Sequence, residues 1–256
     1  MTTTIQSKRV LFAGDTLLDG PACYLAGVMT HFGIDFDYIP SDEPLAPALQ
    51  ASQYGLYILS DYPSHQLATF DYARILNDVK AGAGLLMVGG WESFHGLAGE
   101  YHKTPIADAL PVTMLNEDDR VNSPVPWVPV KQADHPAVAD LPWETPPVIG
   151  GFCRIKTRPD AQEILSAVKL DIHVDPAGEI STTPGESTTL LAVGEHGQGR
   201  TAAVACDFAP HWVATLVDWG DARVNAHAKG SEEIEVGNCY AQFVGQLLHW
   251  LLRKDA

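Results

Sequence analysis

The sequence predicts an α/β fold with a mostly parallel central sheet, and three observations support this prediction. Over the first hundred residues, short apolar runs typical of buried strands alternate with amphipathic segments of helical period. Glycine or aspartate follows several of these segments, as expected where strands and helices end. The chain has 256 residues, enough to bury a full core. We therefore expect one domain over residues 1–256, with right-handed crossovers that bury the sheet on both faces.

The expected elements follow one another closely in the first ninety residues. The segment RVLFAG is a short β-rich run, DFDYIP alternates, and YGLYILSD and LLMVGG are apolar enough to be buried. The intervening segments carry apolar residues at helical spacing, and Gly33 suits the C-terminal cap of the first helix. We expect strands at 9–14, 35–40, 54–61 and 85–90, and helices at 20–33 and 70–84.

The second half of the chain begins with a change of composition. Residues 111–150 are rich in proline, which removes a ladder donor, so we expect irregular or edge structure in an insertion at about 111–187. Residues 188–207 predict two strands joined by a glycine-rich hairpin turn. A last helix is predicted because one apolar stripe combines Tyr240, Phe243, Val244, Leu247, Leu248 and Leu251.

Charge and cysteine content exclude several classes of function. The formal net charge is −16 and the pI is about 4.8, which argues against nucleic acid or an anionic membrane as a partner. No apolar run approaches a membrane span, and no signal-peptide core is present. The four cysteines form no CxxC pair, which favours reduced thiols over a zinc site. We expect a cytoplasmic protein with a small-molecule ligand, without metal or cofactor; a homo-oligomer is left open.

Polar residues stand where the predicted strands end. Asp15 follows the first strand, Asp61 the third, and Asp207 a late strand that leads into His211 and Trp212. Ligands of open parallel sheets bind beyond the carboxyl ends of the strands. We therefore expect these side chains to converge on one pocket.

The segments GGWESFHG and GRTAAVACDFAPHW resemble the class I glutamine amidotransferase-like superfamily. The sequence is most similar to its branch of uncharacterised glutamine amidotransferase-like proteins, which is related to the trehalose-utilisation proteins. The resemblance covers roughly residues 8–110 and 185–253. It implies a flavodoxin-like, three-layer fold, in agreement with the order of strands and helices.

The same resemblance identifies a departure from the superfamily's catalytic pattern. Its working members hold a nucleophilic cysteine in a G-x-C-x-G turn, which falls here on residues 89–93 and places Trp91 at the cysteine position. An indole offers no nucleophilic lone pair, so glutamine hydrolysis through a thioester is not expected. It would need Cys153 or Cys206 to reach this turn, against the order of the segments.

The remaining groups suggest acid–base chemistry. We expect His211 as general acid or base, oriented by Asp207, with Glu92 as a further catalytic carboxylate. The alternative is that His211 is structural and only forms a hydrogen bond to a loop. Glu92 and Ser93 would contact a ligand, or simply cap a helix after the turn.

Aromatic and polar residues near the turn complete the expected substrate site, together with Asp15 and Asp61. Trp91 would fill the old nucleophile pocket, or form an aromatic wall for a sugar ring with Trp212 and Tyr101. His95 is a further candidate for substrate contact. Its spacing from His102 fits no metal motif.

Two functions of different classes follow. The first is a hydrolase- or lyase-like enzyme that acts on a small polar metabolite, with a carbohydrate-derived compound suggested by the resemblance. The alternative is a non-catalytic module that binds a ligand or assembles into an oligomer through the insertion.

Overall fold

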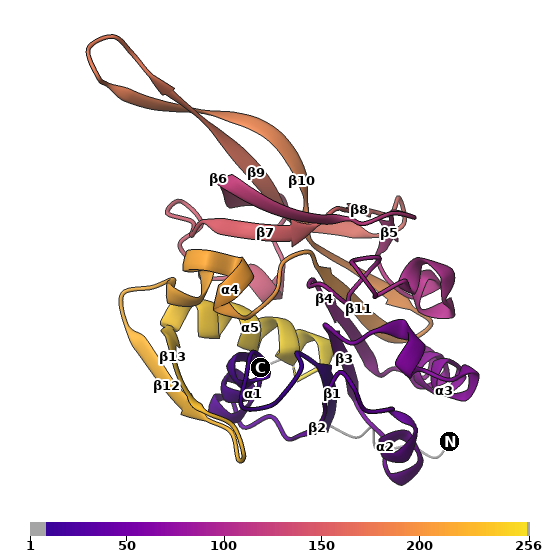
Figure 1. Cartoon of the computed structure of the whole chain (residues 1–256). Coiled ribbons are helices and arrows are strands. Elements are labelled where there is room, and N and C mark those ends of the chain that lie inside the picture. The colour runs from indigo at the N-terminus through magenta and orange to yellow at the C-terminus, as the bar shows by residue number, and fades with distance from the viewer. Residues whose placement is uncertain (1–8, 255–256) are drawn as a thin grey trace.

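A nine-stranded sheet forms the centre of the molecule, in the order β2-β1-β3-β4-β11-β10-β9-β6-β7 (Figure 1). The computed structural model describes residues 9–254, apart from the side chains of His211 and Ala214. Five neighbouring strands are parallel: β2 (Phe36–Ile39), β1 (Val10–Gly14), β3 (Leu56–Ser60), β4 (Gly84–Val88) and β11 (Gly199–Val204). Four continue the sheet in antiparallel pairs: β10 (Ile180–His196), β9 (Gln162–Val174), β6 (Arg120–Lys131) and β7 (Ile149–Cys153). The predicted α/β class is confirmed, and the sheet is mixed.

Helices cover the parallel half of this sheet, with α1 and α5 on one side and α3 on the other (Figure 1). All six residues of the predicted apolar stripe on α5 are buried, because this helix packs into the core. The helices are α1 (Ala22–His31), α2 (Ala46–Ala51), α3 (Thr69–Lys80), α4 (Pro210–Val213) and α5 (Asn238–Leu251). Two small antiparallel sheets pair β5 (Val112–Met114) with β8 (Ile155–Thr157), and β12 (Arg223–His227) with β13 (Glu233–Gly237). Short 3-10 helices lie at Ser64–Gln66, Tyr101–Lys103, Pro105–Asp108, Pro136–Val138 and Ala214–Asp218. No helix within residues 9–254 has the length and apolar character needed to cross a membrane.

The core sits on both faces of the parallel strands. Every residue of β1, β3 and β4 is buried, so these strands read as continuous apolar runs rather than as alternating ones. This burial on two faces is why the expected strands at 9–14, 54–61 and 85–90 match the observed ones closely.

The expectation of irregular or edge structure in the proline-rich segment is wrong for residues 120–131. They form β6, which lies between β9 and β7. Proline is tolerated because the pairing of β6 with β7 shifts between Asn122 and Trp127, where Pro124 and Pro126 lie. Pro129 lies beyond the last pair with β7 and faces a strand on one side only. This proline-rich strand therefore extends the main sheet.

A long two-stranded arm projects from the domain where β9 and β10 continue past the rest of the sheet (Figure 1). Residues at its outer end pair only with each other, as Ile180 does with Val174 and Thr182 with Ile172. Paired residues share a face of the ribbon, so one face of the arm collects apolar side chains. We name residues 170–184 the β9–β10 arm.

Backbone contact between the ends of β4 and β11 sets the shape of the sheet edge. The Gly89 amide donates hydrogen bonds to the carbonyls of Val204 (2.8 Å) and Cys206 (3.2 Å). A Cβ atom at Gly89 would lie 1.9 Å from the Ala205 carbonyl oxygen. Only glycine permits this approach, because the obstructing atoms belong to the backbone and cannot rotate away.

Gly89→Ala is expected to lower the free energy of unfolding by more than about 3 kcal/mol, because a core strand pair must separate. Gly33→Ala is the matched control: Gly33 has a φ of +63° but no atom within 4 Å of an added Cβ. Its cost is the left-handed conformation alone, about 1–2 kcal/mol. Urea denaturation of both variants measures the difference. Equal losses would show that backbone contact at Gly89 does not constrain the fold.

Candidate functional site

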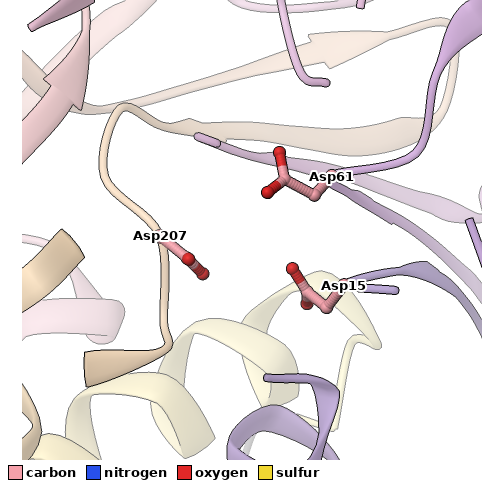
Figure 2. Close-up of side chains that lie close together, drawn as sticks. All are labelled: Asp15, Asp61 and Asp207. Atoms are coloured by element: carbon pink, nitrogen blue, oxygen red, sulfur yellow. The ribbon is translucent and has the colours of Figure 1, made fainter. Parts of the chain in front are cut away.

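Three aspartates converge at the carboxyl ends of the parallel strands. Asp15 directly follows β1, Asp61 directly follows β3, and Asp207 lies in the loop after β11. One carboxylate oxygen of each lies within 4.8 Å of those of the other two. Figure 2 shows the three carboxylates pointing toward a common space. The expected convergence of these three strand ends is therefore present in the structure.

Asp61 is held by the turn that follows β4. The Glu92 amide donates to Asp61 Oδ1 (2.8 Å), and the Asp61 amide donates to Ser93 Oγ (3.0 Å). A Cβ atom at Gly90 would lie 2.0 Å from Asp61 Oδ1, so the carboxylate occupies the space that a side chain would need. Gly89 thus permits the close contact between the ends of β4 and β11, and Gly90 permits the close approach of the Asp61 carboxylate.

Asp15 and Asp207 are both buried. Ser60 Oγ donates to Asp15 Oδ1 (3.1 Å), while Asp207 Oδ1 accepts the amide hydrogens of Phe208 and Ala209, just before α4. Burial raises the pKa of Asp15 well above its ordinary value, and the charges of Asp207 and Asp61 raise it further. Burial raises the pKa of Asp207 to about 7, although its two backbone hydrogen bonds oppose the shift.

This arrangement can store a proton near neutral pH. Carboxylates a few ångströms apart in a buried site cannot all be charged, so the cluster retains protons that an exposed aspartate would release. The same three oxygen atoms are of the ligand type that Mg²⁺ and Ca²⁺ prefer. The expectation that no metal binds stays untested.

A cavity of about 350 Å³ opens beside the cluster. Asp15 and Asp61 form part of its wall. Two members of the acidic cluster therefore face a space that is large enough for a small metabolite. Trp91 lies on the same wall and is 48% exposed, which is unusual for a tryptophan. The cavity is lined by Asp15, Thr16, Pro21, Asp61, Trp91, Glu92 and Leu97.

The exposed indole is held in place from one side. The Arg120 guanidinium carbon lies 4.7 Å from the centre of a Trp91 ring, a cation–π contact. Asp118 binds Arg120 through both Nε (2.9 Å) and Nη2 (2.7 Å), which fixes the guanidinium plane. Trp91 therefore lies on the cavity wall as an exposed indole in contact with Arg120.

The expectation of a helix directly after this turn is wrong. Residues 91–99 form successive turns, and the next regular element is the 3-10 helix Tyr101–Lys103. Buried Asp119 organises these turns by accepting the amide hydrogens of His95 and Gly96, both at 3.0 Å. Glu92 and Ser93 therefore cap no helix. Ser93 positions Asp61, and Glu92 lines the cavity with a pKa that burial raises.

Cysteine does reach this turn, contrary to the expectation from segment order. Cys153, the last residue of β7, donates from Sγ to the Gly90 carbonyl oxygen at 3.4 Å. Burial raises the pKa of this thiol well above its ordinary value, and the Asp119 charge adds to the shift. Burial also raises the pKa of Cys206. Neither thiol has the exposed, electropositive setting that favours a thiolate nucleophile.

The other predicted site residues lie elsewhere. Tyr101 is fully buried and donates to the Tyr62 carbonyl (2.6 Å), and Trp212 is buried with its Nε1 bonded to Asn122 Oδ1 (2.7 Å). Neither forms part of the cavity wall. The His95 ring stacks on His102, with 4.6 Å between the ring centres, also outside that wall. The side chain of His211 lies outside the described part of the structure.

Sequence reasoning missed Arg120, Asp118 and Asp119. They belong to the run EDDR, whose arginine is the first residue of β6, about thirty residues from the turn that they support. All four residues of this run are charged, so in sequence it looks like a solvent-exposed loop. No local pattern connects it to Trp91.

Comparison with known proteins identifies relatives of the whole fold. Two cytoplasmic proteins of Salmonella typhimurium are similar: STM3548 (24% identity, 94% of this chain and 98% of that one, TM-score 0.69) and STM1381 (23%, 95% and 99%, TM-score 0.68). A ThuA-like protein of Bacteroides uniformis matches at 11% identity over 100% of this chain and 96% of the other, with a TM-score of 0.56. These likenesses show a shared fold.

The search of curated proteins found no match. A family model described as putative glutamine amidotransferase, GATase1-like, matches residues 56–226. This span covers β3, β4, the turn that carries Trp91, the proline-rich segment at 111–150 and the loop that carries Asp207. The matched residues make up more than half of the chain, which therefore belongs to the GATase1-like family.

Proposed function

We propose that the chain is a hydrolase- or lyase-like enzyme that acts on a small, polar, uncharged metabolite of carbohydrate type. The observation that carries this proposal is the cavity that joins the exposed Trp91 to the acidic cluster. Glutamine amidotransfer is not proposed, because tryptophan replaces the nucleophile and the cysteines nearby are buried thiols. Two relatives of the same fold are described as cytoplasmic, and we keep the cytoplasm as the proposed location.

The acidic cluster supplies both roles that acid–base catalysis needs. Asp15 faces the cavity, and burial raises the pKa of its carboxyl well above the ordinary value, which suits it to protonate a leaving oxygen. Asp61 faces the same cavity, and an amide hydrogen bond orients its carboxylate for accepting a proton. Asp207 lies behind them and tunes Asp15 through its charge. Glu92 and His211 stay predicted further groups of this site.

The wall of the cavity selects the substrate class. The indole of Trp91, with Pro21 and Leu97, offers apolar surface for the C–H face of a sugar ring. The carboxylates accept hydrogen bonds from hydroxyl groups and repel anions. A neutral polyhydroxylated compound satisfies both conditions, whereas a phosphorylated or acidic sugar does not.

Asp207→Asn is expected to flatten the fall of stability with rising pH. The folded state keeps the Asp207 proton up to about pH 7, whereas the unfolded carboxyl loses it near its ordinary pKa. Between about pH 4 and about pH 7 the folded state therefore binds more protons, and stability decreases by up to about 1.4 kcal/mol per pH unit from this group. Urea denaturation across this range, in EDTA so that no divalent cation replaces the proton, measures both proteins. Identical pH profiles would contradict a proton stored at Asp207.

Trp91→Ala is expected to abolish or strongly weaken binding of neutral sugars, because the variant loses the wall of the cavity. Saturation-transfer NMR with glucose, xylose and sorbitol, each compared with gluconate as an anionic probe, measures this. Phe70→Ala is the matched control, since Phe70 is an exposed aromatic residue that does not line the cavity. Preference for gluconate, or equal binding by both variants, would contradict the proposed substrate class.

A second candidate function, assembly through the β9–β10 arm, has its own observation. Ile172, Val174 and Ile180 are 52%, 66% and 71% exposed, and strand pairing places them on one face of the arm. A lone two-stranded ribbon is marginally stable in water, so this face needs a cover. A second copy fits best, because a two-fold interface brings the same uncharged face together and keeps the net charge of −16 on each chain apart.

Val174→Asp is expected to convert a dimer into a monomer without unfolding the domain. Ser181→Asp is the control on the same strand pair, because Ser181 pairs with His173 on the other face of the arm. Light scattering coupled to size exclusion measures the mass of each protein. A monomeric wild-type chain, or dimers of both variants, would contradict assembly through this face.

A further inference from the structure

Two histidines join the ends of a loop that forms part of the cavity wall beside the acidic cluster. The rings of His95 and His102 stack, with 4.6 Å between their centres and 25° between their planes. The loop between them, residues 96–101, contains Leu97, which is 64% exposed and lines the cavity together with Trp91. The stack therefore lies at the base of a loop on which the shape of the cavity depends.

Backbone hydrogen bonds fold this loop onto the turn that carries Trp91. The Leu97 amide donates to the Trp91 carbonyl (2.7 Å), and the Glu100 amide donates to the His95 carbonyl (3.0 Å). Phe94 and Glu100 both have a φ of +49°, a left-handed conformation that costs free energy in any residue other than glycine. A loop with strained backbone and an exposed apolar side chain belongs to the part of a protein that opens most readily.

The stacked rings resist full protonation. His95 Nδ1 donates to the Gly96 carbonyl (2.9 Å), whereas His102 Nδ1 is buried and has no hydrogen-bond partner within the described residues. The neutral His102 ring therefore carries its hydrogen on Nε2, because a buried N–H without an acceptor is costly. A proton added to His102 Nδ1 would meet neither solvent nor an acceptor. With His95 charged as well, two like charges would lie at stacking distance.

Charged groups of both signs surround the pair. Positive side chains oppose a further proton, and carboxylates favour it. The positive groups are Lys103 and Arg158, and the carboxylates are Glu100, Asp118 and Asp119. For His102 the opposing effects dominate: burial, and then the charges of His95 and Lys103, lower its pKa. The closed loop therefore binds fewer protons than an open loop in which both rings reach water.

We propose that the His95–His102 stack is a pH-sensitive clasp, which holds Leu97 beside Trp91 at neutral pH and releases it in mild acid. As a control of substrate binding, the clasp rests on the proposed function, because the released loop takes away one part of the cavity wall. Acid favours release because the open loop binds more protons below the ordinary histidine pKa of 6.5. The open population then rises as the pH falls, by at most about ten-fold per pH unit for one proton.

Hydrogen exchange of the full chain tests the clasp without any ligand. The protection of the Leu97 and Glu100 amides is measured at about pH 7.5 and about pH 5.5, each relative to an unstructured peptide at the same pH. The acceptors of both amides are backbone carbonyls, which do not titrate. We expect protection in the wild type to be about five-fold lower at the acid pH.

His102→Phe keeps a flat ring on His95 but takes no proton, so its protection should change by less than about two-fold between the same pH values. His102→Gln, a second variant that does not titrate, should behave alike and covers a poor fit of the phenyl ring. His227→Gln is the matched control. It removes a titratable ring from β12, where Nε2 donates to the Ser231 carbonyl (2.9 Å), and should keep the pH dependence of the wild type.

Two results overturn the proposal. One is equal protection of the wild type at both pH values. The other is the same loss of protection in both His102 variants, which would assign the pH dependence to another group such as Asp119.

Xylose separates the clasp from the proposed function. Saturating xylose should raise the protection of the Leu97 amide in the wild type at about pH 5.5, because a ligand of the cavity binds the closed loop. A loop that responds to pH through His102 but not to xylose would support the clasp and contradict the proposed substrate class. Protection by xylose without any pH dependence would support the substrate class and overturn the clasp.

Discussion

The candidate site depends on one close approach, between the turn after β4 and the strands on either side of it. Gly89 packs against the Ala205 carbonyl of the β11 end, and Gly90 lies under the carboxylate of Asp61 after β3. Side chains at these two positions would push both neighbours away. Because they are absent, residues from separate strand ends come within hydrogen-bond distance of each other, and the cluster of Asp15, Asp61 and Asp207 can form.

The electrostatic properties of the site follow from this compactness. Three carboxyl groups share a space in which full ionisation is costly, so burial and mutual repulsion keep protons on the cluster. The same edge is unsuited to a thiolate. The turn at Trp91 does not lead into a helix, so no helix N-terminus stabilises negative charge there, and Cys153 is buried beneath the turn. The site thus combines a family fold with the chemistry of carboxyl groups.

The hydrophobic periodicity and the amino-acid composition of the segments were sufficient to predict the parallel strands of the sheet. The buried strands β1, β3 and β4 and the amphipathic α5 each obey one local rule, and their carboxyl ends necessarily meet at one edge. The antiparallel half could not be predicted, because β6 tolerates proline only through an irregular register with β7. The single-domain interpretation stays a prediction. The aromatic residues show the same limit: Trp91, Tyr101 and Trp212 look equivalent in sequence, yet long-range contacts expose the first and bury the other two.

Two buried threonines on neighbouring strands show why the hydrogen bonding of a buried side chain cannot be inferred from residue type. Thr189 and Thr201 are both almost inaccessible, and both lie in strands where β-branched side chains pack well. The protein satisfies Thr189 with Glu163 and Thr157, so this hydroxyl belongs to the internal hydrogen-bond network. Opposite Thr201 lies Gly194, which has no side chain to offer, and the Thr201 hydroxyl has no hydrogen-bond partner within residues 9–254. The same residue type is therefore satisfied in one strand and unpaired in the neighbouring strand, and only the long-range contacts of each residue decide which.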